Sequence, residues 1–282
     1  MKVITPLSQA LSEGVLTRAE LRVFMTRTNG TALMHLAMFL LLMAVTGTIV
    51  WMSLDSIWFV PAMFLHGIVL VHHFSLQHEC VHYTVFRSRW LNELMGNYCG
   101  LVIILPNRFF RYEHCDHHTH TQIAGKDPEL LPLPRSLWDY ACYLSSIPYW
   151  RTKFVELFRR IGGHLTTEEK RFVPKVEHKS LVLEARCMVA FYGLVFCAMY
   201  YSNWWAPLWF WLIPVLIGEP VMRFIRFAEH VGRPLVVEMR QNTRTTLVSP
   251  IWRFLCWNMN YHAEHHYAPS VPFHANRPCT IN

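Results

Sequence analysis

The longest uncharged stretch of the sequence runs from Cys187 to Gly218, where 32 consecutive residues include no Asp, Glu, Lys or Arg. A helix needs about 20 predominantly apolar residues to cross the hydrocarbon core of a bilayer. The run is therefore long enough for two crossings, and the polar pair at 202–203, followed by two tryptophans, divides it near its middle. We predict a tight helical hairpin in a membrane, with an aromatic belt at its turn.

A second pair of apolar runs lies near the N-terminus. Ala32 to Met52 is free of formal charge, and Ile57 to Val71 follows it after a short polar turn. The whole chain is 52% apolar with 18 Phe and 11 Trp, which is more than a soluble domain of this length needs. We predict an all-α integral membrane fold with four transmembrane helices in two hairpins, spanning about residues 32–52, 57–74, 183–201 and 204–219.

The basic residues are distributed unevenly around these spans. Of the 26 Lys and Arg, 25 fall before the first span, between the second and third, or after the fourth, and the two short turns hold none. The positive-inside rule places those three segments, and with them both termini, in the cytosol. Topology thus accounts for the net charge of +7, and no nucleic-acid partner is needed. Residues 1–30 lack the pattern of a secretory signal.

We therefore expect a multi-pass membrane protein whose single domain covers residues 1–282, with a cytosolic cap at 75–180 and 220–282.

Three histidine clusters lie in this cap. In the middle one, the His-x-x-His-His spacing brings the rings to one face if the segment is helical. The first cluster has histidines at i and i+4, and the third repeats the spacing of the second. The candidate metal ligands of the clusters are His78 and His82, then His114, His117 and His118, then His262, His265 and His266.

The donor chemistry of the clusters points to a pair of metals. Eight imidazoles are too many for one zinc, which takes four ligands. Nitrogen donors without thiolates suit iron, copper or nickel as well as zinc. The eight cysteines form no Cys-x-x-Cys pair, which argues against a thiolate zinc site. Interfacial histidines or axial haem ligands are the alternatives, and the repeated spacing on one membrane face argues against both.

Other residues near the clusters are assigned supporting roles or none. Carboxylates inside or beside the clusters can orient imidazoles through the second ring nitrogen, and the candidates are Glu79, Glu113, Asp116 and Glu264. His72 and His73 are further candidates for support, whereas His120 lies off the ligand face of a helix. Isolated histidines are expected to be packing or surface residues, namely His35, His66, His164, His178 and His274.

His230 is predicted to be a ninth ligand. It follows the fourth span at a short distance, as His78 follows the second, so both should lie at a similar height above the membrane. Glu229 beside it and Arg226 one turn earlier give it a polar neighbourhood. The alternative is an interfacial histidine bonded to a backbone carbonyl.

Three segments of the sequence form a recognisable set of motifs, namely His78 to His82, Phe110 to His118 with Asp127-Pro128-Glu129, and Asn258 to His266 with Pro269 to His274. Together they resemble the membrane fatty acid desaturase family, and the resemblance covers roughly Leu70 to His274. It implies four membrane helices under a cytosolic cap, two non-haem irons held by histidines, and O2 with two electrons for each hydrogen-removing turnover. A further helical stretch follows the third cluster in that family, whereas this chain ends at Asn282.

We accordingly expect a di-iron acyl desaturase whose iron ligands are its only catalytic residues. Its substrate would be a membrane lipid or acyl chain. Because no haem, flavin or ferredoxin domain is recognisable, electrons should come from a separate donor, such as a ferredoxin, a cytochrome b5-like protein or a reductase. A hydroxylase or ketolase uses the same ligands and stays open. A non-enzymatic haem or metal membrane protein would instead place histidines across the spans.

Overall fold

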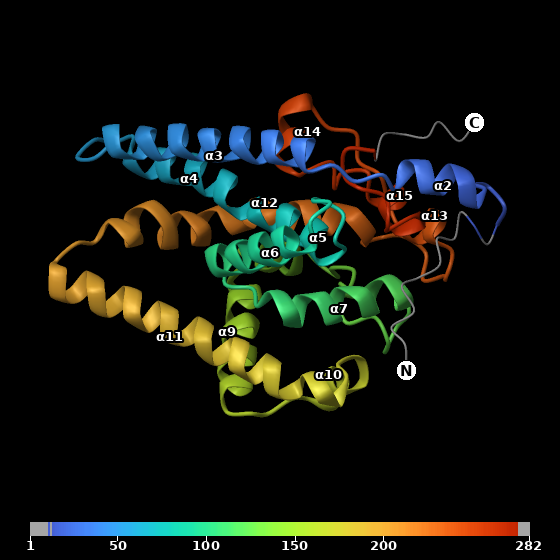
Figure 1. Cartoon of the computed structure of the whole chain (residues 1–282). Helices are drawn as coiled ribbons and strands as arrows, with labels where there is room; N and C mark the ends of the chain where they lie inside the picture. Colours follow the sequence, from blue (N-terminus) through green and yellow to red (C-terminus); the bar gives the residue numbers. More distant parts are fainter. Residues whose placement is uncertain (1–10, 12, 276–282) are drawn as a thin grey trace.

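The computed structural model describes residue 11 and residues 13–275, and within them all regular structure is helical (Figure 1). This agrees with the all-α prediction. The two turns that join the long helices lie at one end of the molecule, on the left in Figure 1. The helices that carry the histidine clusters lie toward the other end, so each hairpin points its open end at the clusters.

Four helical segments are long and apolar enough to cross a membrane, as the sequence predicts. Only 17% of the apolar stretch in α3 and 22% of that in α11 is buried, against 67% of that in α4 and α5. The first two would face lipid, and the α4–α5 segment is the inner one. The segments are α3 (Asn29–Met52), α4 (Phe59–Val71) with α5 (His73–Val81), η1 (Lys175–Glu177) with α11 (His178–Ser202), and η2 (Leu208–Leu212) with α12 (Ile213–His230).

Two of these helices run further than the predicted spans. α4 continues through His72 into α5, and α12 continues to His230, so both helices extend past residues 74 and 219, where the predicted membrane spans end. An apolar pattern stops at the first polar side chains, whereas a helix continues as long as its backbone hydrogen bonds do. Even Pro220 lies inside α12 without ending it. His78 and His230 therefore lie on the same helices as two of the candidate spans.

The inner helices α4 and α12 touch backbone to backbone. A Cβ atom added at Gly218 would lie 2.5 Å from the carbonyl carbon and oxygen of Gly67, closer than real Cβ contacts come. Only glycine at both positions allows this approach. The contact fixes the spacing of the two helices that lead to His78 and His230.

Helix α7 (Asn107–His120) carries the middle cluster and is anchored at its start by another helix. No side chain of its own caps it, because the residue before it is Pro106. Instead the carboxylate of Glu184, in α11, accepts hydrogen bonds from the backbone N–H groups of Arg108 at 2.7 Å and Phe109 at 3.2 Å. These are donors that a helix start leaves unpaired. The membrane-type helix α11 thus fixes the register of α7.

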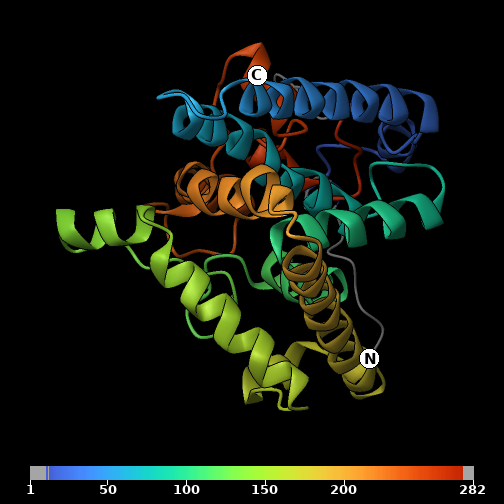
Figure 2. The ribbon, with the colours of Figure 1, turned by 90° about the vertical axis from the view of Figure 1, so that its left-hand side faces the viewer.

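The remaining helices are shorter than the membrane-type segments. The apolar stretch at 94–106 lies mostly in α6 (Arg89–Ile103), which packs on α5. Figure 2 shows α8 and α9 in yellow-green, leading away from α12. On α8 the side chain of Trp138 is 75% exposed, as an aromatic residue at a membrane interface would be. The helices not yet given are α2 (Arg18–Phe24), α8 (Leu137–Leu144), α9 (Ile147–Ile161), α10 (Thr167–Phe172), α13 (Met239–Asn242), α14 (Pro250–Leu255) and α15 (His262–Tyr267).

The glycine contact predicts the result of a matched pair of substitutions. Gly218→Ala should lower stability by about 1–3 kcal/mol, because α4 and α12 must separate to admit the methyl group. Gly193→Ala, on α11 with no atom within 4 Å of its added Cβ, should be neutral or stabilising. Thermal unfolding of both variants in detergent measures the difference. Equal melting temperatures would contradict close packing at this point.

Candidate metal centre

The histidine clusters come from four helices. The first cluster lies on and just after α5, the second on α7 and the third on α15, while His230 is the last residue of α12. The rings of the second cluster were predicted to share a face if their segment is helical, and the segment is indeed helical, because it lies in α7. The structure brings all nine predicted residues into two groups, and every one of them is buried or nearly so.

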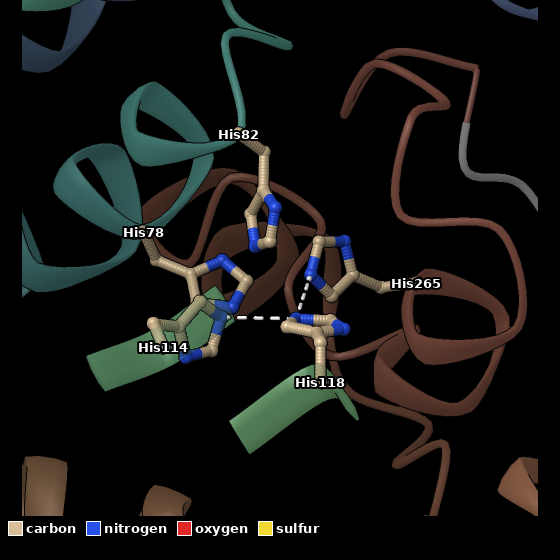
Figure 3. Close-up of side chains that lie close together, drawn as sticks. All are labelled: His78, His82, His114, His118 and His265. Carbon is tan, nitrogen blue, oxygen red and sulfur yellow. Dashed lines mark hydrogen bonds between the residues drawn. The ribbon is translucent and has the colours of Figure 1, made fainter. Parts of the chain in front are cut away.

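The first group consists of five histidines, drawn in Figure 3. Their possible ligand nitrogens all lie within 4.8 Å of one another. The Nε2 atom of His118 lies 3.0 Å from that of His114 and 3.1 Å from that of His265. Figure 3 shows the rings turned inward from three separate segments of the chain. The members of this five-histidine group are His78, His82, His114, His118 and His265.

The second group consists of four histidines and includes His230. The Nε2 atom of His262 lies 3.0 Å from that of His230 and 3.1 Å from that of His266. The nitrogens of the group, like those of the first, lie within 4.8 Å of one another. The members of this four-histidine group are His117, His230, His262 and His266.

Helical geometry divides each His-x-x-His-His cluster between the groups. On α7, His114 and His118 are one turn apart and enter the five-histidine group, whereas His117 turns to the other. On α15 the pair one turn apart enters the four-histidine group, and His265 goes to the first. The groups adjoin, since the rings of His118 and His266 stack with centroids 4.1 Å apart. One continuous site thus offers two metal positions.

The hydrogen bonds of the rings fit a bound cation. The Nδ1 atoms of His114 and His117 lie 2.8 Å from Glu129 and 2.7 Å from Asp127, so each ring carries its proton there. Their Nε2 atoms are then unprotonated, and that of His117 is buried without a hydrogen-bond partner. Unprotonated nitrogens that face one another in a dry interior need a positive centre between them.

Electrostatics keep most of these rings neutral. Burial, reinforced by neighbouring imidazoles, lowers the pKa of His82 to about 3 and those of His114 and His118 well below their usual value. Burial also lowers the pKa of His117, but the carboxylates of Glu129 and Asp127 outweigh it and raise the pKa overall. Neutral imidazole is the form that binds metals. The rings of His82, His114 and His118 are therefore in their ligating form at neutral pH.

The carboxylates around the site differ from those predicted. Of the four candidates, Glu79 does lie 3.3 Å from Nδ1 of His78. The prediction was wrong for Asp116, which bonds His120 and Arg171, and for Glu264, which bonds Thr245. Glu113 makes no hydrogen bond to a ring of either group. These three lie near the histidines in sequence but on other faces of their helices.

The carboxylates that do support the rings come from elsewhere in the chain. Asp127 and Glu129 lie on the loop after α7, in a motif that the resemblance included without a role. Glu229 lies 3.7 Å from His262, and Arg226 bonds both Glu129 and Glu229. No spacing rule links a loop to a helix that precedes it, so the signal available in the sequence was the motif alone.

The remaining histidines stay outside both groups. His72 and His73 each bond a carbonyl of the preceding turn, and His66 bonds Thr46 and the carbonyl of Phe210.

His230 makes the backbone contact expected of an interfacial histidine, the alternative to its role as a ligand. Its Nδ1 lies 3.3 Å from the carbonyl of Asn242, but its Nε2 faces His262. The contact between Nδ1 of His230 and a backbone carbonyl therefore does not prevent Nε2 of the same ring from facing the metal site.

Two adjoining groups of buried histidines, next to four membrane-type helices, have the geometry of a histidine-rich metal site. The family model described as fatty acid desaturase matches residues 56–280, and the chain belongs to this family.

Curated relatives of the chain include lipid desaturases of cyanobacteria. The chain is 22% identical to the sn-1 oleoyl-lipid 12-desaturase of Picosynechococcus sp., over 75% of this chain and 65% of the relative. It is 24% identical to the protein of the same name from Synechocystis sp., over 73% and 62%. It is 25% identical to the sn-1 acyl-lipid omega-3 desaturase (ferredoxin) of Nostoc sp., over 78% and 64%. The chain thus spans less than two thirds of the length of these relatives.

The Asp127 hydrogen bond predicts a loss of metal affinity in Asp127→Asn. An amide cannot stabilise the Nδ1–H of His117 as a carboxylate does, so affinity for Fe(II) or Co(II) should fall about 10–100-fold. Competition with a chelator measures this in detergent. Asp55→Asn, in the exposed turn after α3, is the matched control and should bind as the unchanged protein does. Equal affinities in the two variants would remove the role assigned to Asp127.

Proposed function

We propose that this protein is an O2-dependent di-iron oxidoreductase that introduces a double bond into a fatty acyl or lipid-like chain. The observation that carries the proposal is the pair of adjoining groups of five and four histidines in a member of the fatty acid desaturase family. The names of the relatives, two oleoyl-lipid desaturases and an acyl-lipid desaturase, support a lipid-bound acyl chain as the substrate.

The nine histidines of the two groups are the ligands that we propose for two non-haem irons. A set of imidazoles without thiolates suits iron, and five nitrogens in one group exceed the four that zinc takes. When bound, the irons supply the O2 chemistry that removal of hydrogen from an unactivated carbon requires. Five nitrogens within 4.8 Å of one another leave no room for a haem between them, which disfavours the haem alternative.

The protein's own residues hold the ligands in place and in the right protonation state. Asp127 and Glu129 keep the protons of His117 and His114 on Nδ1, so that Nε2 faces the site. Arg226 forms ion pairs with both Glu129 and Glu229, which fixes the position of the two carboxylates. Burial excludes water, which protects reactive oxygen chemistry from side reactions. The same arrangement serves a hydroxylase or ketolase, so the product must decide between these reactions.

Electrons are proposed to come from a separate one-electron donor. The relative from Nostoc sp. is named with ferredoxin, which supports a donor of that kind.

The cytosolic position of the site and of both termini is likewise a proposal. The distribution of basic residues supports it, and so does the position of the two hairpin turns at one end of the molecule (Figure 1).

The proposed ligands predict the metal content. Purified from iron-replete cells in mild detergent, the protein should carry about two irons per chain. His230→Ala should lose part of the iron and the activity yet insert normally, because it removes one of the four nitrogens of its group. His164→Ala and His178→Ala, outside both groups, should keep both properties. Metal analysis that finds one zinc, or full iron in His230→Ala, would contradict the assignment.

The proposed reaction predicts a change in cellular lipids. Expressed with a reductase and a ferredoxin in a host that lacks the activity, the protein should raise the unsaturated fraction of an acyl lipid. Mass spectrometry of total lipids measures it, and His118→Ala is the inactive control. Products that carry oxygen and no new double bond would instead establish a hydroxylase or ketolase.

A further inference from the structure

A cavity of about 360 Å³ lies next to the five-histidine group, between α7, α9 and α12. Its volume is within the range of small-molecule sites. Phe74 and Phe110 form part of its wall, and the ring of Phe110 stacks on that of His114 with centroids 5.2 Å apart. The cavity therefore borders the metal centre through an aromatic wall, while its other lining residues on α9 and α12 include charged side chains.

Lys153 lines this cavity, and the carboxylates of Glu219, Glu113 and Glu156 attract its charge only from beyond ion-pair distance. The side chain is buried, with 9% of the residue exposed, and no carboxylate lies within ion-pair distance among the described residues. Its single hydrogen bond, to the carbonyl of Ile103, is 3.4 Å long, although an ammonium group has three donors. The faces of Tyr149 and Trp150 lie 4.4 Å and 5.4 Å from Nζ and replace part of the lost hydration.

The other cations of the cavity are already paired. Arg160 bonds Glu156 and Glu169, Arg223 bonds Glu219, and Arg226 bonds Glu129 and Glu229, all through side-chain ion pairs. Lys153 is thus the one cation lining the cavity that lacks a carboxylate among the described residues.

Burying an ammonium group without a direct ion pair is costly, and the cost appears as a lowered pKa. Burial lowers the pKa of Lys153 to about 7, because the charged form loses its hydration. A group held at such a cost on the wall of an open cavity is stabilised when an anion enters. A solvent-exposed lysine keeps its hydration and does not incur this cost.

We propose that Lys153 binds an anionic oxygen, a carboxylate or a phosphate, at the polar end of a lipid whose apolar part lies along Phe74, Phe110 and Leu157. The inference rests on the proposed function, since it assigns the head group of that substrate class. The apolar part then lies against the aromatic wall, on the side of the cavity that borders the five-histidine group.

Photo-crosslinking tests this without turnover. A fatty acid that carries a diazirine should label the segment Ile147–Ile161, mapped by mass spectrometry of the full chain in nanodiscs. Oleate and 1-oleoyl lysophosphatidate are competitors that separate a carboxylate from a phosphate source. Monoolein, which is uncharged, should compete at least about tenfold more weakly than the better of the two, because a charge-assisted hydrogen bond contributes roughly 1.5–3 kcal/mol.

Substitution of Lys153 gives the decisive comparison. In Lys153→Gln the anionic competitor should lose its advantage over monoolein, whereas Lys153→Arg should keep it and Lys170→Gln, on the exposed side of α10, should resemble the unchanged protein. Equal competition by anionic and neutral lipids in the unchanged protein would overturn the proposal, as would a retained advantage in Lys153→Gln. Anion selectivity without any lipid oxidation would instead contradict the proposed function and leave this site standing.

Discussion

The arrangement of the cap depends on an energetically unfavourable feature. Nine imidazoles are buried with their nitrogens turned toward one another. Unprotonated nitrogens repel each other in a medium of low dielectric constant, and protonating them would place several like charges in one cavity. The protein opposes both effects at the far side of the rings. Asp127 and Glu129 accept hydrogen bonds from the Nδ1–H groups of His117 and His114, and Arg226 forms ion pairs with Glu129 and Glu229.

Much of this architecture is encoded in local patterns. Membrane-length helices are set by unbroken apolar stretches, so all four could be predicted from hydropathy and length. The spacing of His114, His117 and His118 fixes where their rings project from a helix, and the parallel between His78 and His230 placed the ninth histidine. These signals are short in range or repeat a simple geometric rule, which is why the sequence reveals them.

What could not be predicted involves contacts between distant segments. The division of each cluster between two groups depends on how α7 and α15 face each other, and no spacing within either helix specifies that. The carboxylate of Glu184 that caps α7 belongs to a helix more than seventy residues away in sequence. The supporting carboxylates were sought beside the histidines, whereas Asp127 and Glu129 approach from a loop. The helices also continue past the predicted apolar spans, because backbone hydrogen bonding does not stop where the side chains become polar.

The contact of Gly67 with Gly218 is also a fulcrum, the point about which α4 and α12 would tilt relative to each other. From this point each helix extends roughly 17 Å to its histidine, at about 1.5 Å per residue. A rotation of one degree at the fulcrum would therefore displace His78 relative to His230 by roughly 0.3 Å, a shift that exceeds the tolerance of about 0.2 Å on metal–ligand distances. The accuracy of the metal centre is consequently set deep between the membrane-type helices, and bilayer thickness or lateral pressure acting on α4 and α12 has a direct route to it.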